Sequence, residues 1–233
     1  NMSSSSLVSR LASPFREFGT VPGALYLADR MLRKVSSKAG IYVYELIVQP
    51  ITEQPLLRTN LIRNMEFRLI PSHDPLIATM PARPEIKDAR FAQGATCFGA
   101  FRKGQLVAYL WYCTDSYRED EVRCDYVLVA KHDSVFDFDL YVLPEHRLGV
   151  AFAALWQGAN AHLRGRGIAR SYSRVTWFNT TSRRSHSHLG GKRTGVACFV
   201  VLGPLQFMVS TLWPHVRVTW GEGRVRLELR EGL

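Results

Sequence analysis

The 233-residue chain lacks several patterns that assign a sequence quickly to a class of protein. Its cysteines, Cys97, Cys113, Cys124 and Cys198, show no C-x-x-C spacing and no neighbouring histidine pattern, which argues against a metal site. Three of them lie in apolar runs, so we expect buried free thiols and a cytoplasmic protein. The longest apolar run, residues 196–209, contains Gly-Pro and a glutamine, and is therefore too interrupted to span a bilayer.

Recognisable targeting and nucleic-acid-binding signatures are also missing. The serine-rich start shows no charged stretch leading into an apolar one, so we expect no secretory signal. Without a helix-turn-helix, zinc-finger or RNP signature, nucleic acid is not expected as a partner. What the chain does have is positive charge, since 30 Lys and Arg against 20 Asp and Glu give a formal net charge of +10. Such a field attracts acidic membrane surfaces, phosphate-bearing molecules and acidic proteins alike.

Strand and helix signals alternate along the chain. Residues 20–35 place apolar residues at helical spacing with basic residues off that stripe, which predicts an amphipathic helix that packs on the domain or lies on a membrane surface. Two apolar runs, 96–101 and 105–112, flank Arg-Lys-Gly and predict a hairpin. The sum predicts an α/β (α+β) fold with a mixed sheet and interposed helices. Further strands are predicted at residues 41–51, 65–70, 122–130, 135–142, 168–176, 196–202, 206–211, 216–220 and 224–229, and further helices at 86–93 and 144–164.

The strand at 135–142 leads through Pro144 and Arg147 into the long helix. Such a turn exposes backbone N–H groups at the positive end of a helix, which is a natural anion site. Arg147 adds a guanidinium that suits phosphate oxygens. The same strand carries Asp137 and Asp139, which strand alternation predicts on one face. There they would hold an ammonium group or act as a base, or else pair with arginines.

The strand at 168–176 runs directly into a polar segment, residues 177–191. Asn179 is placed to cap a short helix that a Leu-Gly pair ends. His186 lies in this helix and is a candidate acid, because a histidine ordinarily titrates near neutrality. The alternative is a surface histidine in an Arg-, Ser- and His-rich run. His188, which we expect to be solvated, is the internal control.

The segment 177–191 resembles a motif of the GNAT superfamily of acyl-CoA N-acyltransferases. Asn179, Ser182, His186, Leu189 and Gly190 fall where that family carries N-x-x-A/S-x-x-x-Y-x-x-L-G-F. In the family the Tyr position holds the group that protonates the leaving thiolate, so the resemblance implies this role for His186. Asn179 is then a helix cap, a contact to the pantetheine arm, or both.

The turn after residue 142 resembles a second motif of the same family, V-x-P-x-x-R-G-x-G-x-G-x-x-L, which cradles the pyrophosphate of coenzyme A. Val142, Pro144, Arg147 and Leu155 are in register with it. The family also takes a backbone N–H from this strand to stabilise the oxygen of the reacting carbonyl. The resemblance therefore implies an acyl-CoA donor without a metal.

The glycine positions of this second motif depart from the family. They hold Leu148, Val150 and Phe152, and Gly149 is out of register, so side chains are expected to crowd the approach of a phosphate to the backbone. The cofactor then sits differently, or its site is weakened. The residues expected to bind the donor are Tyr141, Val142, Leu143, Arg147, Leu148, Gly149, Val150, Ala151, Asn179 and Ser182.

The resemblance implies a central, mostly antiparallel sheet flanked by helices, with strands that splay at the cofactor cleft. Residues 1–64 are interpreted as an N-terminal extension with the basic helix and a strand, and residues 65–233 as the acyltransferase domain. The expected reaction is direct transfer of an acetyl or longer acyl group to a primary amine of a small molecule, glycan or peptide. Because no cysteine has a histidine partner in a nucleophile motif, no covalent acyl-enzyme is expected.

Two alternatives remain open from the sequence. An acyl carrier protein is an alternative donor, because a basic surface suits an acidic carrier, and the product is then an N-acyl amino acid or a modified glycan. The filled glycine positions and the high charge also fit a non-catalytic basic module with the same fold. Peripheral contact with the inner face of a membrane is compatible with either, and no oligomeric state is predicted.

Overall fold

A computed structural model of the chain describes residues 20–230, which form two compact units. Three strands, β1 (Ala39–Pro50), β6 (Cys124–Leu128) and β8 (Arg170–Thr176), are each divided between the units. Unit 1 consists of the described residues up to Ile47, Glu119–Tyr126 and the described residues from Arg174 on, and unit 2 consists of Val48–Arg118 and Val127–Ser173.

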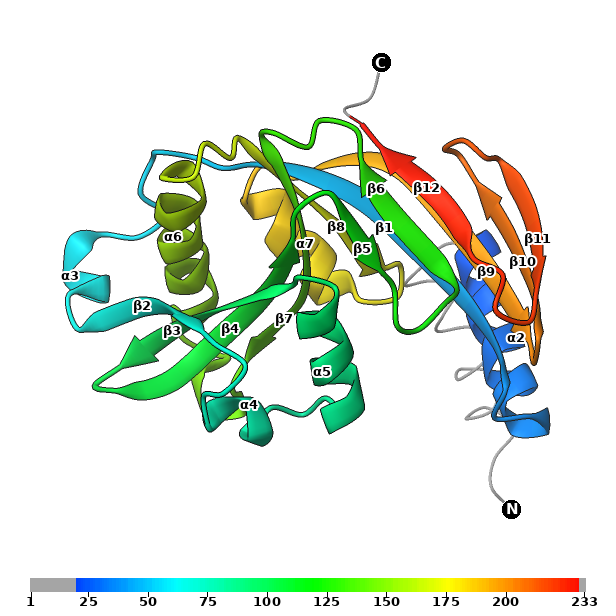
Figure 1. Ribbon diagram of the computed structural model, residues 1–233, viewed down its shortest axis with the longest axis horizontal. Helices are drawn as coiled ribbons and strands as arrows, with labels where there is room; N and C mark the ends of the chain where they lie inside the picture. Colours follow the sequence, from blue (N-terminus) through cyan, green and yellow to red (C-terminus); the bar gives the residue numbers. More distant parts are fainter. Residues whose placement is uncertain (1–19, 231–233) are drawn as a thin grey trace. The chain divides into compact units, whose positions relative to one another are not determined.

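Unit 2 is a sheet with strand order β8-β7-β4-β3-β2, covered by a helix on each face (Figure 1). Trp111 of β4 packs on Phe91 of α5 with 4.8 Å between ring centroids. The next residue, Tyr112, has its hydroxyl 2.9 Å from Nε2 of His162 on α6. Because successive residues of a strand point to opposite faces, α5 and α6 lie on opposite faces. The elements are α3 (Thr59–Ile62), β2 (Met65–Ile70), α4 (Leu76–Thr79), α5 (Pro84–Ala92), β3 (Thr96–Arg102), β4 (Gln105–Cys113), β5 (Ser116–Arg118), β7 (Ser134–Val142), a 3₁₀ turn (Pro144–His146) and α6 (Ala151–Arg164).

The pairing in unit 2 is antiparallel from β2 through β3 and β4 to β7, whereas β7 and β8 are parallel. The β3–β4 hairpin predicted from the sequence is confirmed. Its turn needs left-handed backbone at Lys103 (φ 52°) and Gly104 (φ 76°), which explains the glycine at this position. The predicted mixed, mostly antiparallel sheet flanked by helices is likewise confirmed.

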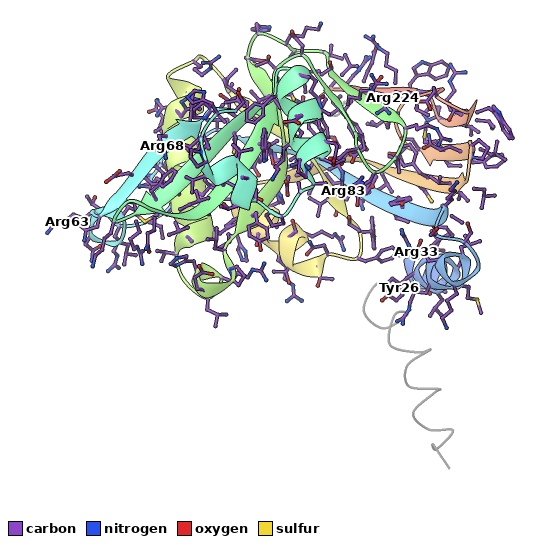
Figure 2. All side chains as sticks on the ribbon, turned by 60° about the horizontal axis from the view of Figure 1, so that its bottom comes forward. Tyr26, Arg33, Arg63, Arg68, Arg83 and Arg224 are labelled. Atoms are coloured by element: carbon purple, nitrogen blue, oxygen red, sulfur yellow. The ribbon has the colours of Figure 1, made fainter. Side chains whose placement is uncertain are left out.

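Unit 1 contains strands in the order β11-β10-β9-β1, with the end of β8 beside β1 through a hydrogen bond from Trp177 N to Val43 O (2.8 Å). The predicted N-terminal helix is present and docks on this unit. The carboxylate of Asp29 accepts bonds from Arg33 Nε (2.8 Å) and from the backbone N–H of Ile41 (2.7 Å), which fixes the helix to the start of β1. Figure 2 labels Tyr26 and Arg33 on this helix. The elements are α2 (Thr20–Val35), β6 (Cys124–Leu128), α7 (Thr180–His188), β9 (Lys192–Leu202), β10 (Leu205–Ser210), β11 (Val216–Trp220) and β12 (Val225–Leu229).

A buried charge cluster lies inside unit 1. Glu119 is 2% exposed and receives two hydrogen bonds from Arg174, both 2.7 Å long. Arg174 also pairs with Glu121 at 2.8 Å, and Glu121 accepts a bond from the Tyr44 hydroxyl at 2.9 Å. Because each charge in the cluster has a hydrogen-bonded partner of opposite sign, the cost of burying these charges is offset.

The four cysteines are unpaired thiols, as expected from their spacing. Cys97, Cys113 and Cys124 are buried and Cys198 is half-buried. Burial raises the pKa of each thiol, to about 12 for Cys113, so the reactive thiolate form is not populated at neutral pH. Between residues 20 and 230, no helix is long and apolar enough to cross a membrane.

Candidate functional site

β7 and β8 pair in parallel within unit 2, over the register from Ser134–Arg170 to Asp137–Ser173. Within this unit, the last residues of β7 (138–142) pair with β4 and with no other strand, because Ser173 is the last residue of β8 in the unit. We call this stretch the open edge of β7. A strand edge with unpaired backbone groups offers N–H donors and carbonyl acceptors to a ligand.

A bulge in β7 lies just beyond this parallel register. Tyr109 of β4 is opposite Tyr141, whereas Trp111 is opposite Phe138, so β7 has an extra residue here. Asp139, in this interval, has φ 47°, a left-handed conformation that is uncommon for a residue other than glycine. Such a bulge locally disrupts the ladder and bends the strand. The bulge therefore bends β7 just beyond Asp137.

Arg90 of α5 holds the bulge residue. Its guanidinium forms an ion pair with the carboxylate of Asp139 and lies over the rings of Trp111 (5.5 Å) and Phe138 (5.3 Å). The Arg90 side chain is 9% exposed, so the ion pair is shielded from water on the arginine side. An ion pair in this setting offsets the strain of a left-handed aspartate.

Asp137 lies in a different environment. It is 3% exposed, and its carboxylate accepts a hydrogen bond of 2.5 Å from the hydroxyl of Ser171 on β8. Burial raises the pKa of Asp137 to about 7, although the bond from Ser171 acts in the opposite direction. A carboxyl group that titrates near neutral pH has the property required of a general base.

The expectation that Asp137 and Asp139 share one face is wrong. Asp137 is opposite Tyr112, on the face that α6 covers, whereas Asp139 meets Arg90 on the face of Phe138. The physical reason is the bulge, which shifts the alternation of side chains by one residue. The two carboxylates therefore have separate partners and do not form a pair.

Among Tyr141, Val142 and Leu143, which are expected to bind the donor, Val142 is the residue whose backbone N–H points to the open edge. The N–H of Leu143 donates to Val107 O on β4 at 3.0 Å and is therefore occupied. Because N–H groups of successive strand residues point to opposite edges, the N–H of Val142 points to the open edge. Its carbonyl points the same way and accepts a bond from Arg147 Nε at 3.1 Å.

The ring of Tyr141 lies beside this amide and cation. It stacks on Tyr109 with 5.5 Å between centroids, and Arg147 lies over it at 5.4 Å. Arg147 is thus fixed by one hydrogen bond and one cation–π contact, while its exposed end remains available to a ligand.

Crowding of the turn between β7 and α6 is absent at Leu148 and at Gly149. Leu148 projects entirely into solvent. A Cβ added to Gly149 would find its nearest neighbour, His146 O, at 3.5 Å, which is ordinary contact. Val150 precedes α6 without capping it by a side chain, so the first N–H groups of the helix, from Ala151 on, have no side-chain cap. A cavity of about 200 Å³ borders this turn.

The short helix predicted within residues 177–191 forms as α7 (Thr180–His188). The side chain of Asn179 caps α7 by accepting a bond from the backbone N–H of Ser182 at 3.0 Å. The capping role expected of Asn179 is therefore confirmed, and its contact with a pantetheine arm remains a prediction. Ser182 contributes its backbone N–H to this cap.

His186 of α7 is buried, with 5% of its surface exposed. Burial lowers the pKa of His186 to about 4, so the ring is neutral at pH 7. His188, two residues on, is exposed, as expected of the control. A role for His186 as a proton donor remains a prediction.

Two functional residues were not singled out from the sequence. Arg90 was seen only as part of a short helix, and Ser171 only as part of a strand. Neither carries a local signal, because the role of each depends on a partner far away in the sequence, Asp139 and Asp137 respectively.

Comparison with known proteins returns similar structures only. No protein-family model and no curated protein matches the chain. Its structure is similar to that of a conserved protein of unknown function from Staphylococcus epidermidis, with 14% identity and a TM-score of 0.48 over 75% of this chain and 66% of the other. It is similar to a tandem GNAT protein from the clavulanic acid biosynthesis pathway, with 15% identity and a TM-score of 0.43 over 66% of this chain and 50% of the other.

A third similar structure is a GCN5-related glucosamine N-acetyltransferase region of a fungal multidomain GH3 β-N-acetylglucosaminidase. The identity is 14% and the TM-score 0.49, over 76% of this chain and 23% of the other. The chain thus covers less than two thirds of the length of each of these three structures. Similarities this distant do not establish an activity, which has to be argued from the chain's own residues.

Proposed function

We propose that the chain is an N-acyltransferase that moves an acyl group directly from a coenzyme A thioester to a primary amine. The observation that carries the proposal is the bulge in β7 at Asp139, beyond which the N–H of Val142 points away from β4. Direct transfer needs such a donor, because the thioester oxygen gains negative charge as the amine attacks.

The residues around the open edge suit a phosphate-bearing donor. Arg147 supplies a fixed guanidinium beside Val142, and the uncapped start of α6 supplies backbone N–H groups at the positive end of a helix. With Leu148 projecting into solvent, this backbone stays accessible to phosphate oxygens. The pantetheine arm would then lie along the open edge and pair with it as a strand does.

The departing thiolate has to be protonated, and His186 is the residue we assign to this step. Its ring is neutral at pH 7 in the absence of a ligand. A thiolate forming beside it would raise its pKa, because a nearby negative charge favours the imidazolium form. Loss of the amine proton requires a base, for which Asp137 has a suitable pKa of about 7.

Binding of the donor tests the proposal most directly. Acetyl-CoA, a long-chain acyl-CoA and the matching acyl carrier protein thioester would each be titrated into the full chain by calorimetry. Saturable binding of a coenzyme A thioester, followed by thiol release when a primary amine is added, is the expected result. Preference for the carrier-protein thioester would replace coenzyme A as the donor, and binding of neither would refute the proposal.

Arg147→Gln is the matched test of the phosphate contact. We expect it to weaken binding of acetyl-CoA about tenfold, because it removes a charge-assisted contact to a phosphate. Arg217→Gln, at an exposed arginine of β11, removes the same charge and should change binding less than about twofold. Equal loss in both variants would mean that only the overall charge attracts the ligand.

A further inference from the structure

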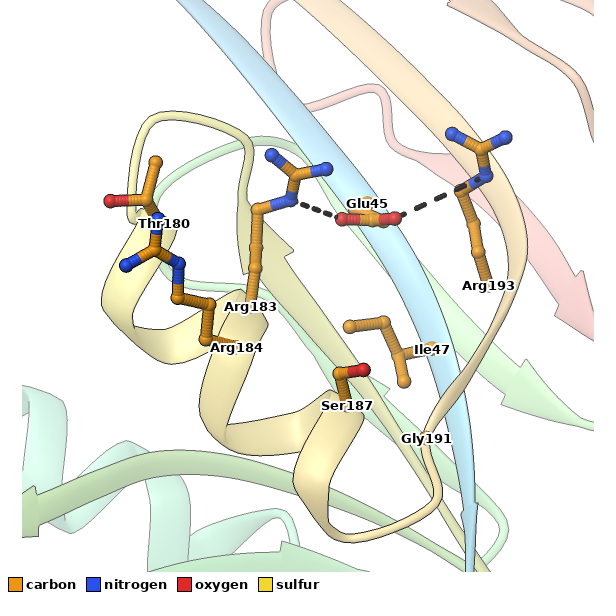
Figure 3. Close-up of a pocket in the computed structure, with 8 residues that line it drawn as sticks. All are labelled: Glu45, Ile47, Thr180, Arg183, Arg184, Ser187, Gly191 and Arg193. Carbon is orange, nitrogen blue, oxygen red and sulfur yellow. Dashed lines mark hydrogen bonds and ion pairs between the residues drawn. The ribbon is translucent and has the colours of Figure 1, made fainter. Parts of the chain in front are cut away.

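A second polar cavity lies within unit 1, between α7, β1 and β9 (Figure 3). Its volume is about 420 Å³, which is in the range of small-molecule sites. Three arginines, Arg183, Arg184 and Arg193, line it against a single acid, Glu45, so its lining is net positive. It shares no residue with the open edge of β7.

The carboxylate of Glu45 holds Arg183 in a short ion pair and lies near a second arginine, Arg193. Arg183 Nε lies 2.5 Å from Glu45 Oε2, and Arg193 Nε lies 4.0 Å from Oε1 (Figure 3). The Glu45 side chain is 11% exposed, so this anchor is largely withdrawn from solvent. Because both arginines approach Glu45 through Nε, their paired Nη groups are left for another acceptor.

Arg183 is fixed from a second direction as well. Its guanidinium lies 4.4 Å over the ring of Trp177, and its side chain is 29% exposed. An arginine held between a carboxylate and an aromatic ring loses little further freedom when it binds a ligand. The arginine is thus preorganised to donate hydrogen bonds to the oxygens of a planar carboxylate or a tetrahedral phosphate group.

The remaining lining completes a binding site rather than a bare charged surface. Thr180 and Ser187 add hydroxyl groups, and Ile47 adds an apolar surface. Gly191 allows the chain after α7 to pack closely, since a Cβ there would lie 3.0 Å from Ile47 Cγ2 and 2.7 Å from His186 O. Hydroxyl groups beside arginines are a common environment for phosphate and carboxylate groups.

We propose that this arginine cavity binds a small molecule through a phosphate or carboxylate group. The paired Nη groups of Arg183 and Arg193 would contact the oxyanion, with Arg184 adding a third charge. This proposal does not depend on acyl transfer, because no residue of the open edge takes part.

The test is calorimetric titration of the full chain, without any thioester, at constant ionic strength. Inorganic pyrophosphate and citrate serve as probes of the two oxyanion classes. Saturable binding of either supports the proposal, and the tighter probe identifies the class. Absence of saturable binding of both would overturn it.

Three variants separate a site from a general electrostatic field. Arg184→Gln and Arg193→Gln should each weaken binding of the better probe about tenfold. Lys192→Gln removes the same charge from an exposed neighbour outside the cavity lining and should change binding less than about twofold. Equal weakening in all three would overturn the proposal.

A fourth variant tests the geometry. Arg183→Lys keeps the charge but removes the paired Nη groups, so binding should still weaken about tenfold. Unchanged binding would overturn the oriented contact. Loss of acyl transfer in Arg147→Gln would leave all these results unaffected, so failure of the proposed function is distinguishable from failure of this site.

Discussion

Asp137→Asn tests whether the sheet of unit 2 contains a buried carboxyl group whose pKa is near neutral. The substitution keeps the size and polarity of the side chain and removes its ability to ionise. In the protein, the pKa of Asp137 is raised to about 7 by burial. In the unfolded chain it returns to the ordinary aspartate value of about 3.9.

The sign of the effect follows from linkage. A carboxyl group with a raised pKa in the folded state stabilises the fold while it is protonated, and this contribution is lost as pH rises toward the folded pKa. Between pH 5 and pH 8 the two pKa values imply a loss of about 2.5 kcal/mol in the wild type. The Asp137→Asn variant has no such loss. The unfolding free energy of the variant minus that of the wild type should therefore increase by about 2.5 kcal/mol from pH 5 to pH 8.

The assay is urea denaturation of both proteins at several pH values from 5 to 8. The quantity of interest is the difference between their unfolding free energies, in which the titration of every other group cancels. A Ser171→Ala variant is the internal check, because it removes the bond that lowers the pKa of Asp137 and should move the transition to higher pH. A difference that stays constant with pH would refute the argument that Asp137 is buried and protonated.

Three further predictions concern the bulge and α7. Arg90→Met should lower the unfolding free energy by about 3 kcal/mol in urea denaturation, with part of the loss recovered in the double variant with Asp139→Asn, because the single change leaves a carboxylate without its partner. His186→Ala should lower turnover of an amine substrate more than His188→Ala, and equal turnover in the two would remove His186 from the mechanism. The wild type should also lose about 3 kcal/mol of unfolding free energy as pH falls from 6.5 to 4, because the lowered pKa of His186 leaves the unfolded chain with more bound protons than the folded one. A His186→Gln variant that retains this loss in urea denaturation would contradict the lowered pKa of His186.

Local patterns predicted much of the fold. The two apolar runs around Arg-Lys-Gly became β3 and β4, with Lys103 and Gly104 in the left-handed turn that a short hairpin requires. Asn179 capped the short helix α7 as its position before Ser182 indicated. In each case the residues that determine the structure lie within a few positions of one another.

Non-local contacts account for what the sequence did not reveal. Residues 135–142 alternate apolar and polar side chains without interruption, so a regular strand is the natural prediction. The bulge at Asp139 is stabilised by Arg90, which comes from α5, and no pattern within the strand indicates that contact. Asp137 likewise depends on a distant residue, Ser171 of β8, and the burial of His186 is not indicated by the polar run in which it lies.

The missing glycines of the β7–α6 turn illustrate why a motif has to be interpreted through its backbone. Glycine is required where φ is positive or where another group approaches the Cα closely. The backbone at Leu148, Gly149 and Val150 does not have positive φ, and a Cβ added to Gly149 would meet nothing closer than 3.5 Å. Since Leu148 points into solvent, the larger side chains leave the start of α6 accessible. The departure from the glycine pattern is therefore compatible with an anion site at this turn, and the Arg147→Gln titration measures whether the site is used.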